Sequence, residues 1–474
     1  MRPDEYAAHD AVSLAELVRV GEVTPAELQS CALAAHEQMR EAVNAVVDVH
    51  PIDADRLPTI GALAGVPTLV KDLFHGQVGT VCGNGSRLSE GWEVPLPTQI
   101  YDRAVAAGLV PFGRSTTSEF GIMGTTETLA QGITRSPWSP DHMAGGSSGG
   151  AGAAVGAGIV PVALASDGGG SIRIPASSCG VVGLKPSRGR VPWGLRNKEP
   201  LIGWAVQFAI SRSVRDSAVM LDALCGPTPG DREGLPRPDI AFADAMHVPT
   251  GPLRIAWWAY PWSGHDPDPV IVEATQRTAA LLEEMGHQVE AATPRFDWET
   301  YLQTMTDVWA STNAYTIDTF AATVGREVNN DTVEGATLRM VEEGRNVSAK
   351  DLLLAMDVET SLTMLMNAFF SQYDVLLTPT LAATLAPVGD YDPHALTPAK
   401  ETFAHWSKWE TFLPVFNTTG QPAISLPLHM TPDGLPIGMQ FVAGPGQEAM
   451  LLSLAASLEE ALPWRDRRPP AYVH

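Results

Sequence analysis

Two clusters rich in glycine and serine carry the residues best suited to chemistry. Residues 145–150 read Gly-Gly-Ser-Ser-Gly-Gly, and residues 167–173 read Asp-Gly-Gly-Gly-Ser-Ile-Arg. Consecutive glycines allow the backbone to turn several N–H groups toward one point, where they can stabilise an oxyanion. In the second cluster, three glycines directly precede Ser171. This order predicts a nucleophilic serine beside its own oxyanion hole.

A serine nucleophile needs a base to remove its proton, and Lys71 is the best-placed candidate. It follows the apolar run of residues 65–70 and precedes Asp72. A buried strand would desolvate a lysine at its end, and desolvation lowers a lysine pKa. Asp72 would oppose that shift if its side chain faced the same way. The alternative is an ordinary, solvated lysine at a strand end.

Other interpretations of the glycine-rich segments compete with this one. Residues 145–149 fit the G-x-S-x-G elbow of α/β-hydrolases, which would need a later histidine such as His405 or His429. Residues 150–156 resemble a dinucleotide-binding loop but lack its spacing, and residues 183–187 lack the Gly-Lys-Ser/Thr of a phosphate-binding loop. The twelve histidines show no metal-ligand spacing. We therefore expect neither a cofactor nor a metal.

Composition indicates a globular protein with an acidic surface. The 474 residues include 31 Lys and Arg and 54 Asp and Glu, a net charge of 31 − 54 = −23. Such a charge disfavours nonspecific binding to nucleic acid or to an anionic membrane. The sequence shows neither a signal peptide nor an uninterrupted apolar stretch of membrane-spanning length, so we expect a cytoplasmic protein. The four cysteines have no CxxC spacing and predict no disulfide framework: Cys31, Cys82, Cys179 and Cys225.

Hydrophobic periodicity predicts an α/β fold in one domain spanning residues 1–474. Residues 24–27, Thr-Pro-Ala-Glu, form a capping box that begins a helix. A strand, a helix and a strand over 253–258, 268–285 and 288–291 predict a right-handed βαβ unit with parallel strands. Further helices are expected over 297–320, 349–370 and 449–462, and buried strands over 159–165, 181–184, 375–378 and 423–426.

Several long motifs together resemble the amidase signature family. They comprise both glycine-serine clusters, whose serines Ser147 and Ser171 are 24 residues apart, the upstream lysine, and residues 113–121, 175–186, 417–427 and 433–440. The resemblance is strong over 60–210 and 370–460, the expected signature core. It implies a central twisted mixed β-sheet of many strands with helices on both faces. Residues 211–369 are then a variable, helix-rich region that forms much of the substrate pocket.

The resemblance also implies roles for individual residues. Ser171 would be the nucleophile, Ser147 a bridging serine preceded by a cis peptide bond, and Lys71 the base. This triad would form an acyl-enzyme. The implied oxyanion hole consists of the backbone amides of Gly168, Gly169, Gly170 and Ser171, and the implied supporting residues are Ser148, Asp167 and Arg173.

The implied activity is hydrolysis of C–N bonds in small neutral amides. Gly168 and Ile174 resemble the branch of aminohexanoate-cyclic-dimer hydrolases, aryl acylamidases and urethanases, so aryl or cyclic amides, carbamates and esters are candidate substrates. Alternatives are the glutaminase subunit of a tRNA-dependent amidotransferase and an inactive scaffold. We expect a small-molecule amide or carbamate as the substrate, no nucleic acid or membrane partner, and a monomer or homodimer. Candidate pocket-wall residues, for which core packing is the alternative role, are Trp193, Trp204, Trp309, Tyr315 and Phe320.

Overall fold

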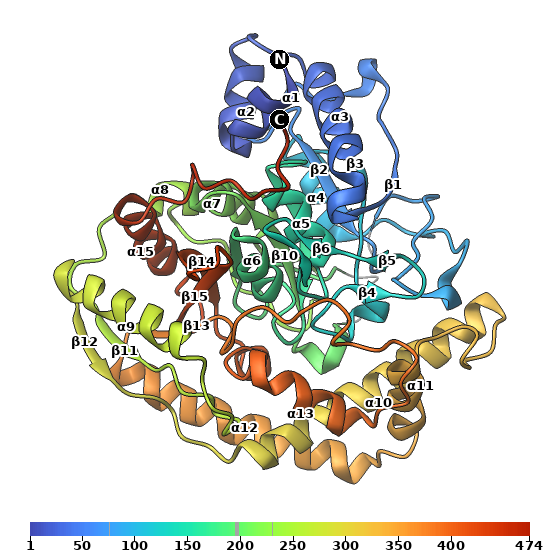
Figure 1. The fold of residues 1–474 in the computed structure, drawn as a ribbon, viewed down its shortest axis with the longest axis vertical. Coiled ribbons are helices and arrows are strands. Elements are labelled where there is room, and N and C mark those ends of the chain that lie inside the picture. Colours follow the sequence, from blue (N-terminus) through green and yellow to red (C-terminus); the bar gives the residue numbers. More distant parts are fainter. Residues whose placement is uncertain (75, 195–198, 230) are drawn as a thin grey trace.

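A large mixed β-sheet forms the centre of the computed structural model (Figure 1). The structure describes residues 1–74, 76–194, 199–229 and 231–474. Within them the sheet has eleven strands, which confirms the expected fold class. In spatial order these are β1 (Val46–Val49), β3 (Val110–Ser115), β2 (Pro67–Lys71), β8 (Val162–Asp167), β10 (Val206–Ser211), β9 (Val182–Lys185), β14 (Ala423–Met430), β15 (Pro436–Ala443), β13 (Val375–Pro379), β11 (Arg254–Trp257) and β12 (Gln288–Ala291).

Two small antiparallel pairs, β4 (Glu127–Thr128) with β5 (Gly132–Ile133) and β6 (Arg135–Ser136) with β7 (Ser139–Met143), lie outside this sheet. The helices that flank it are α1 (Pro3–Ala8), α2 (Ala11–Arg19), α3 (Pro25–Val43), α4 (Gln99–Ala106), α5 (Gly149–Gly156), α6 (Arg173–Cys179), α7 (Val214–Leu224), α8 (Phe242–Ala245), α9 (Pro269–Glu284), α10 (Trp298–Val324), α11 (Gly335–Gly344), α12 (Ala349–Gln372), α13 (Ala399–Glu410), α14 (Val415–Thr418) and α15 (Glu448–Ala461).

Local sequence signals placed several of these elements correctly. Thr24 caps α3 by accepting a hydrogen bond from the Glu27 N–H at 3.2 Å, and the Glu27 carboxylate accepts from the Thr24 N–H at 2.8 Å. The expected βαβ unit is β11–α9–β12, and its two strands pair in parallel. Asp268 caps α9 through the Val270 N–H at 3.1 Å. Short-range capping chemistry therefore determined where these helices begin.

The part of the sheet that positions the site is formed by β2 and β8, which are parallel neighbours. Their carboxyl ends deliver Lys71 and Asp167 to the same edge of the sheet. Helix α5 packs against both strands and against α6. Its glycines permit this closeness, because a Cβ at Gly150 would lie 2.3 Å from the Thr116 backbone nitrogen. Helix α5, which consists of small residues, thus packs closely against the strands that carry the candidate site.

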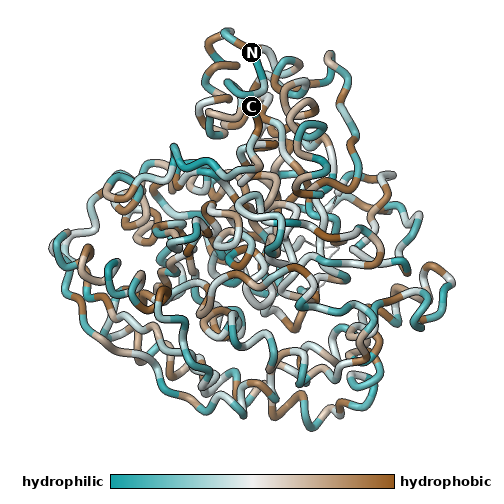
Figure 2. Tube along the Cα trace, in the orientation of Figure 1, coloured by the Kyte–Doolittle hydropathy of each residue, from teal (hydrophilic) through white to brown (hydrophobic). Residues whose placement is uncertain are grey.

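Helices α10, α11, α12 and α13 form a separate layer along one side of the molecule (Figure 1). Hydrophilic stretches concentrate in the outer loops and turns (Figure 2). Among the described residues, α12 is the one helix long and apolar enough to cross a membrane, and a single such helix is weak evidence for a span. Its exposed apolar side chains are Leu353, Leu354, Met356 and Met364.

Candidate active site

Lys71 and Ser147 form the centre of the candidate site. The Lys71 Nζ donates a hydrogen bond to the Ser147 Oγ at 2.7 Å and another to the Ser166 Oγ at 3.0 Å. The Lys71 side chain is fully buried. Burial lowers the pKa of Lys71 to about 7, although the negative charge of Asp167 acts in the opposite direction. A substantial fraction of Lys71 is therefore neutral near pH 7 and able to accept a proton.

Asp72 does not share the environment of Lys71. Its carboxylate accepts hydrogen bonds from the Gly83 N–H at 2.9 Å and from the Gln131 Nε2 at 2.6 Å. It also forms an ion pair with Arg114 at 3.6 Å. Asp72 follows the last residue of β2, and these three partners, none of them a site serine, hold its carboxylate. The sequence left open whether Asp72 would raise the pKa of Lys71. In the structure the negative charge that raises this pKa is that of Asp167.

The two serine clusters meet through their backbones. The Gly146–Ser147 peptide bond is cis, as the resemblance implies. The Ser148 N–H donates to the Ser171 carbonyl at 3.3 Å, and the Ser118 N–H donates to the Ser147 carbonyl at 3.2 Å. The Ser171 side chain lines an internal cavity. The fold thus brings all three expected triad residues to one location.

The loop before Ser171 is shaped by the Asp167 carboxylate. It accepts hydrogen bonds from the N–H groups of Gly170 at 2.7 Å and Ile172 at 3.2 Å. The Gly170 N–H therefore donates its hydrogen bond to Asp167. This differs from the expectation that it would form part of the oxyanion hole. For Gly168, Gly169 and Ser171, the described residues provide no hydrogen-bond acceptor for the backbone N–H. These three amides are the donors available to an oxyanion.

The glycine at position 168 has a packing explanation. A Cβ there would lie 2.9 Å from the Leu201 Cδ1 and 3.4 Å from the Trp309 ring. Leu201 and Trp309 thus occupy the space that a side chain at 168 would need. The glycine leaves room for a tryptophan from α10 to contact the loop before Ser171.

Arg173 holds the Asp167 carboxylate in place through a buried ion pair. Both side chains are fully buried, and the Arg173 Nε and Nη2 each donate to the Asp167 carboxylate at 2.9 Å. Asn417 adds a hydrogen bond from its Nδ2 to the Asp167 Oδ1 at 2.9 Å. Burial alone would raise the pKa of Asp167, but the charge of Arg173 and these hydrogen bonds lower it to about 2. Asp167 is therefore ionised at neutral pH, and its contacts suit a role in positioning the loop.

Several site residues were not identified from the sequence. Ser166 accepts from Lys71, and its backbone contacts the Ser148 side chain, whose Oγ donates to the Ser166 carbonyl at 3.1 Å. Gln440 accepts from the Arg173 Nη1 at 2.8 Å. Asn417 and Gln440 lie within motifs that resemble the family, which was the available signal. Ser166 was marked only by its place at the end of an apolar run.

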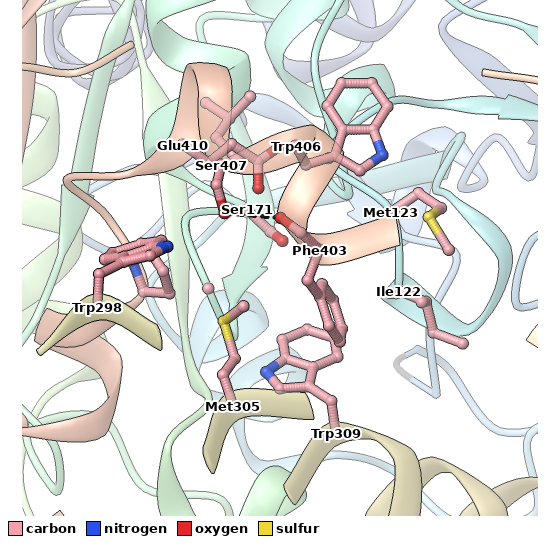
Figure 3. Close-up of a pocket in the computed structure, with 14 residues that line it drawn as sticks. Ile122, Met123, Ser171, Trp298, Met305, Trp309, Phe403, Trp406, Ser407 and Glu410 are labelled. Atoms are coloured by element: carbon pink, nitrogen blue, oxygen red, sulfur yellow. Dashed lines mark hydrogen bonds between the residues drawn. The ribbon is translucent and has the colours of Figure 1, made fainter. Parts of the chain in front are cut away.

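The small cavity beside Ser171 is mostly apolar, and four aromatic side chains line it: Trp298, Trp309, Phe403 and Trp406 (Figure 3). Its free volume is about 30 Å³, which is room for roughly two water molecules. A groove of about 960 Å³ between α10 and α12 is larger, but it includes no triad residue. The residues that line the small cavity are Ile122, Met123, Gly124, Gly169, Ser171, Ile174, Trp298, Met305, Trp309, Phe403, Trp406, Ser407, Glu410 and Pro414.

Of the five pocket-wall candidates from the sequence, Trp309 lines this cavity. Trp204 is a buried core residue, and Tyr315 is 55% exposed. Phe320 packs edge-to-face on Trp92 with ring centroids 5.2 Å apart. Trp193 donates its Nε1–H to the Ala205 carbonyl at 3.2 Å. Helix α10, within the region expected to form much of the pocket, supplies Trp298, Met305 and Trp309, and helix α13, outside that region, supplies four further lining residues.

The histidines required by the competing hydrolase interpretation lie elsewhere. His405 pairs with Asp390 at 2.7 Å, and His429 contacts the Thr278 hydroxyl at 2.7 Å. Neither makes a hydrogen bond to Ser147 or Ser171 within the part of the chain that the structure describes. In the same residues no group of three or more His, Cys, Asp or Glu side chains could hold a metal ion.

Comparisons with known proteins agree with this geometry. The Amidase family model matches residues 26–452. The 6-aminohexanoate-cyclic-dimer hydrolase of Paenarthrobacter ureafaciens is 36% identical, and the match covers 97% of this chain and 96% of the relative. The solved structure of a 6-aminohexanoate cyclic dimer hydrolase matches with a TM-score of 0.92 and 34% identity over 98% of this chain and 99% of the other.

A bacterial aryl acylamidase structure described as belonging to the amidase signature family matches with a TM-score of 0.85 and 26% identity over 96% of each chain. The fold and these matches together define a hydrolase of C–N bonds. The chain belongs to the amidase signature family and is an amidase.

Proposed function

We propose that this amidase cleaves small uncharged amides with Ser171 as nucleophile, Ser147 as proton relay and Lys71 as base. The observation that supports the proposal most strongly is the 2.7 Å hydrogen bond from the buried Lys71 to Ser147. A lysine with a pKa of about 7 can exchange a proton with a serine relay near neutral pH. The same group serves as base and, once protonated, as acid.

In the proposed mechanism, neutral Lys71 takes the proton of Ser147, and Ser147 takes that of Ser171. The Ser171 Oγ then forms a bond to the substrate carbonyl carbon. The oxyanion that develops accepts hydrogen bonds from the amides of Gly168, Gly169 and Ser171. As the C–N bond breaks, the relay returns its proton to the departing nitrogen. Water then adds to the acyl-enzyme by the same proton route and releases the acid.

The proposed substrates are aryl amides and cyclic or oligomeric amides, with carbamates and esters as further possibilities. The relatives described above act on a cyclic amide dimer and on aryl amides by their names. The aromatic and methionine side chains of the cavity favour partly apolar substrates. We also propose that the protein acts without partner subunits, as a cytoplasmic monomer or homodimer.

The pH dependence tests the role of Lys71. For a simple anilide, kcat/KM is expected to rise through pH 7 to a plateau, because the neutral base becomes populated above the Lys71 pKa of about 7. Initial rates between pH 5 and 10 measure the midpoint. A profile that falls over this range, or a midpoint near the ordinary lysine pKa, would contradict the proposed base.

A substrate panel tests the proposed specificity. Aryl amides and carbamates are expected to exceed free glutamine by at least about tenfold in kcat/KM, because an apolar pocket gains little from a charged amino acid. Ser171→Ala protein from the same preparation controls for contaminating amidases. Glutamine as the best substrate, or activity only with a charged tRNA and partner subunits, would favour the glutaminase subunit of an amidotransferase instead.

A further inference from the structure

Glu410 is the residue that the mechanism above leaves unused inside the cavity. It ends α13 and lines the cavity together with Ser171. Figure 3 shows Glu410 and Ser407 of α13 on the same side of the cavity as Ser171, with Trp309 and Met305 of α10 opposite. Among the described lining residues it is the single ionisable group. Apart from its carboxyl group, the polar side chains of the described lining are the hydroxyls of Ser171 and Ser407 and the indole N–H groups of the tryptophans.

One Glu410 oxygen lacks a partner. The Oε1 is buried, and the described residues give it no hydrogen bond. The space it occupies exists because position 124 is glycine: a Cβ there would lie 1.7 Å from the Oε1. The segment around Gly124 also packs on the cluster of Ser147, since a Cβ at Gly146 would lie 2.7 Å from the Met123 carbonyl oxygen. A buried polar atom without a partner is costly unless a ligand or water completes it.

The surroundings of Glu410 favour its neutral form. Burial, together with the negative charge of Asp167 at the end of β8, raises the pKa of Glu410 to about 8. Arg173 offers Glu410 no hydrogen bond or ion pair, because its guanidinium binds Asp167, Asn417, Gln440 and the Leu413 carbonyl. The lining residues from α10 and from the segment before Gly124 carry no charge. At neutral pH Glu410 therefore offers both a hydrogen-bond donor and an acceptor.

We propose that Glu410 is a substrate-contacting specificity residue, whose neutral carboxyl group donates a hydrogen bond to a second carbonyl oxygen of an uncharged amide or carbamate. The proposal rests on the proposed function, because the first carbonyl is the one attacked by Ser171. A second substrate carbonyl accepts a hydrogen bond from the carboxyl group of Glu410, whereas a plain alkyl chain leaves that group without a hydrogen-bond partner. A substrate carboxylate would lie in a cavity whose described lining residues include no cation and, at higher pH, would face an ionised Glu410, so acyl groups with a carboxylate are disfavoured.

Three matched ligands separate these possibilities: butyranilide, the N-methylamide of succinanilic acid, and succinanilic acid itself. They share the anilide and the chain length and end in a methyl, an amide or a carboxylate. Binding is measured in the Ser171→Ala background by the fluorescence of the cavity tryptophans Trp298, Trp309 and Trp406. This readout requires no turnover, so it tests Glu410 even if the proposed function is wrong.

Glu410→Leu is expected to weaken binding of the methylamide about tenfold, the effect of one lost hydrogen bond to a buried group. The same change should leave butyranilide within about twofold, because no hydrogen bond is lost. Glu410→Gln should retain most of the methylamide affinity, since its amide can still donate. Glu401→Gln, an exposed acid on the same helix, is the matched control and should change neither ligand.

The pH profile supplies a second readout. In the active enzyme, kcat/KM for the methylamide should fall above pH 8 as Glu410 ionises and loses its proton donor, while the butyranilide value stays on its plateau. Glu410→Gln should abolish that fall, and it should bind succinanilic acid more tightly than the parent at pH 9. Equal effects of Glu410→Leu on methylamide and butyranilide, or no effect on either, would overturn the Glu410 proposal. Normal ligand selectivity without any turnover would overturn the proposed function alone.

Discussion

Replacing Ser171 by alanine is expected to abolish amide turnover, with a loss of kcat of about 10⁴-fold or more. Ser147→Ala and Lys71→Met should each lower kcat by a similar order, because the proposed mechanism joins the three side chains in one proton-transfer chain. Their effects should not add: the triple variant should be about as slow as Ser171→Ala. Steady-state rates on an anilide and burst kinetics with an activated ester measure this directly.

Lys71→Arg separates the base from a merely structural cation. Arginine keeps a positive charge in the buried site but cannot lose its proton in a protein. We expect Lys71→Arg to be as inactive as Lys71→Met while each variant still unfolds cooperatively. An acyl-enzyme burst in Ser171→Ala, or substantial activity in Lys71→Arg, would contradict the proposed roles.

Asp167→Ala is expected to produce the second large effect, on stability and activity together. The change leaves the fully buried Arg173 without its carboxylate partner, and breaking a buried ion pair costs about 3–5 kcal/mol of unfolding free energy. It also frees the backbone N–H groups of Gly170 and Ile172, whose hydrogen bonds to Asp167 shape the loop around Ser171. The folded fraction should therefore lose at least about a hundredfold in kcat, as when an oxyanion donor is misplaced. Urea unfolding and active-site-titrated rates give the two quantities.

The double variant Asp167→Ala/Arg173→Met distinguishes positioning from stability. Removing both charges should restore much of the lost unfolding free energy, because an apolar replacement of a buried pair is often neutral. Activity should remain low, since the loop still lacks the carboxylate that orders it. Recovery of activity in parallel with stability would show that Asp167 matters only for folding.

The sequence alone determined the local features of this protein. The capping box at Thr24, the proline-initiated helix after Asp268 and the β11–α9–β12 unit are set by neighbouring residues, and the structure places them as predicted. The apolar run before Lys71 likewise indicated a buried strand that ends at a lysine. Lys71 could be recognised as a candidate base at the end of this strand, because a short apolar stretch of sequence is enough to predict a buried strand.

Only the tertiary structure decided what surrounds those residues. The carboxylate that acts on Lys71 is Asp167, because β2 pairs with β8 across 90 or more residues. The adjacent Asp72 lies beyond the end of β2 and is held by other partners. The Gly170 N–H donates a hydrogen bond to Asp167 because the Asp167 carboxylate turns toward the loop that follows it. These contacts depend on sheet order and loop path, which no local spacing encodes.

The cavity wall shows the same limit most clearly. Glu410, Phe403 and Trp406 come from α13, more than 200 residues beyond Ser171 in the chain. The sequence analysis identified none of the three, because residues at such spacing are as typical of core packing in an amphipathic helix as of a substrate site. Whether a buried side chain faces the core or a cavity is set by how helices from distant parts of the chain pack around the nucleophile. The sequence by itself therefore determined the candidate reacting groups, and the packing of α10 and α13 determined what they can bind.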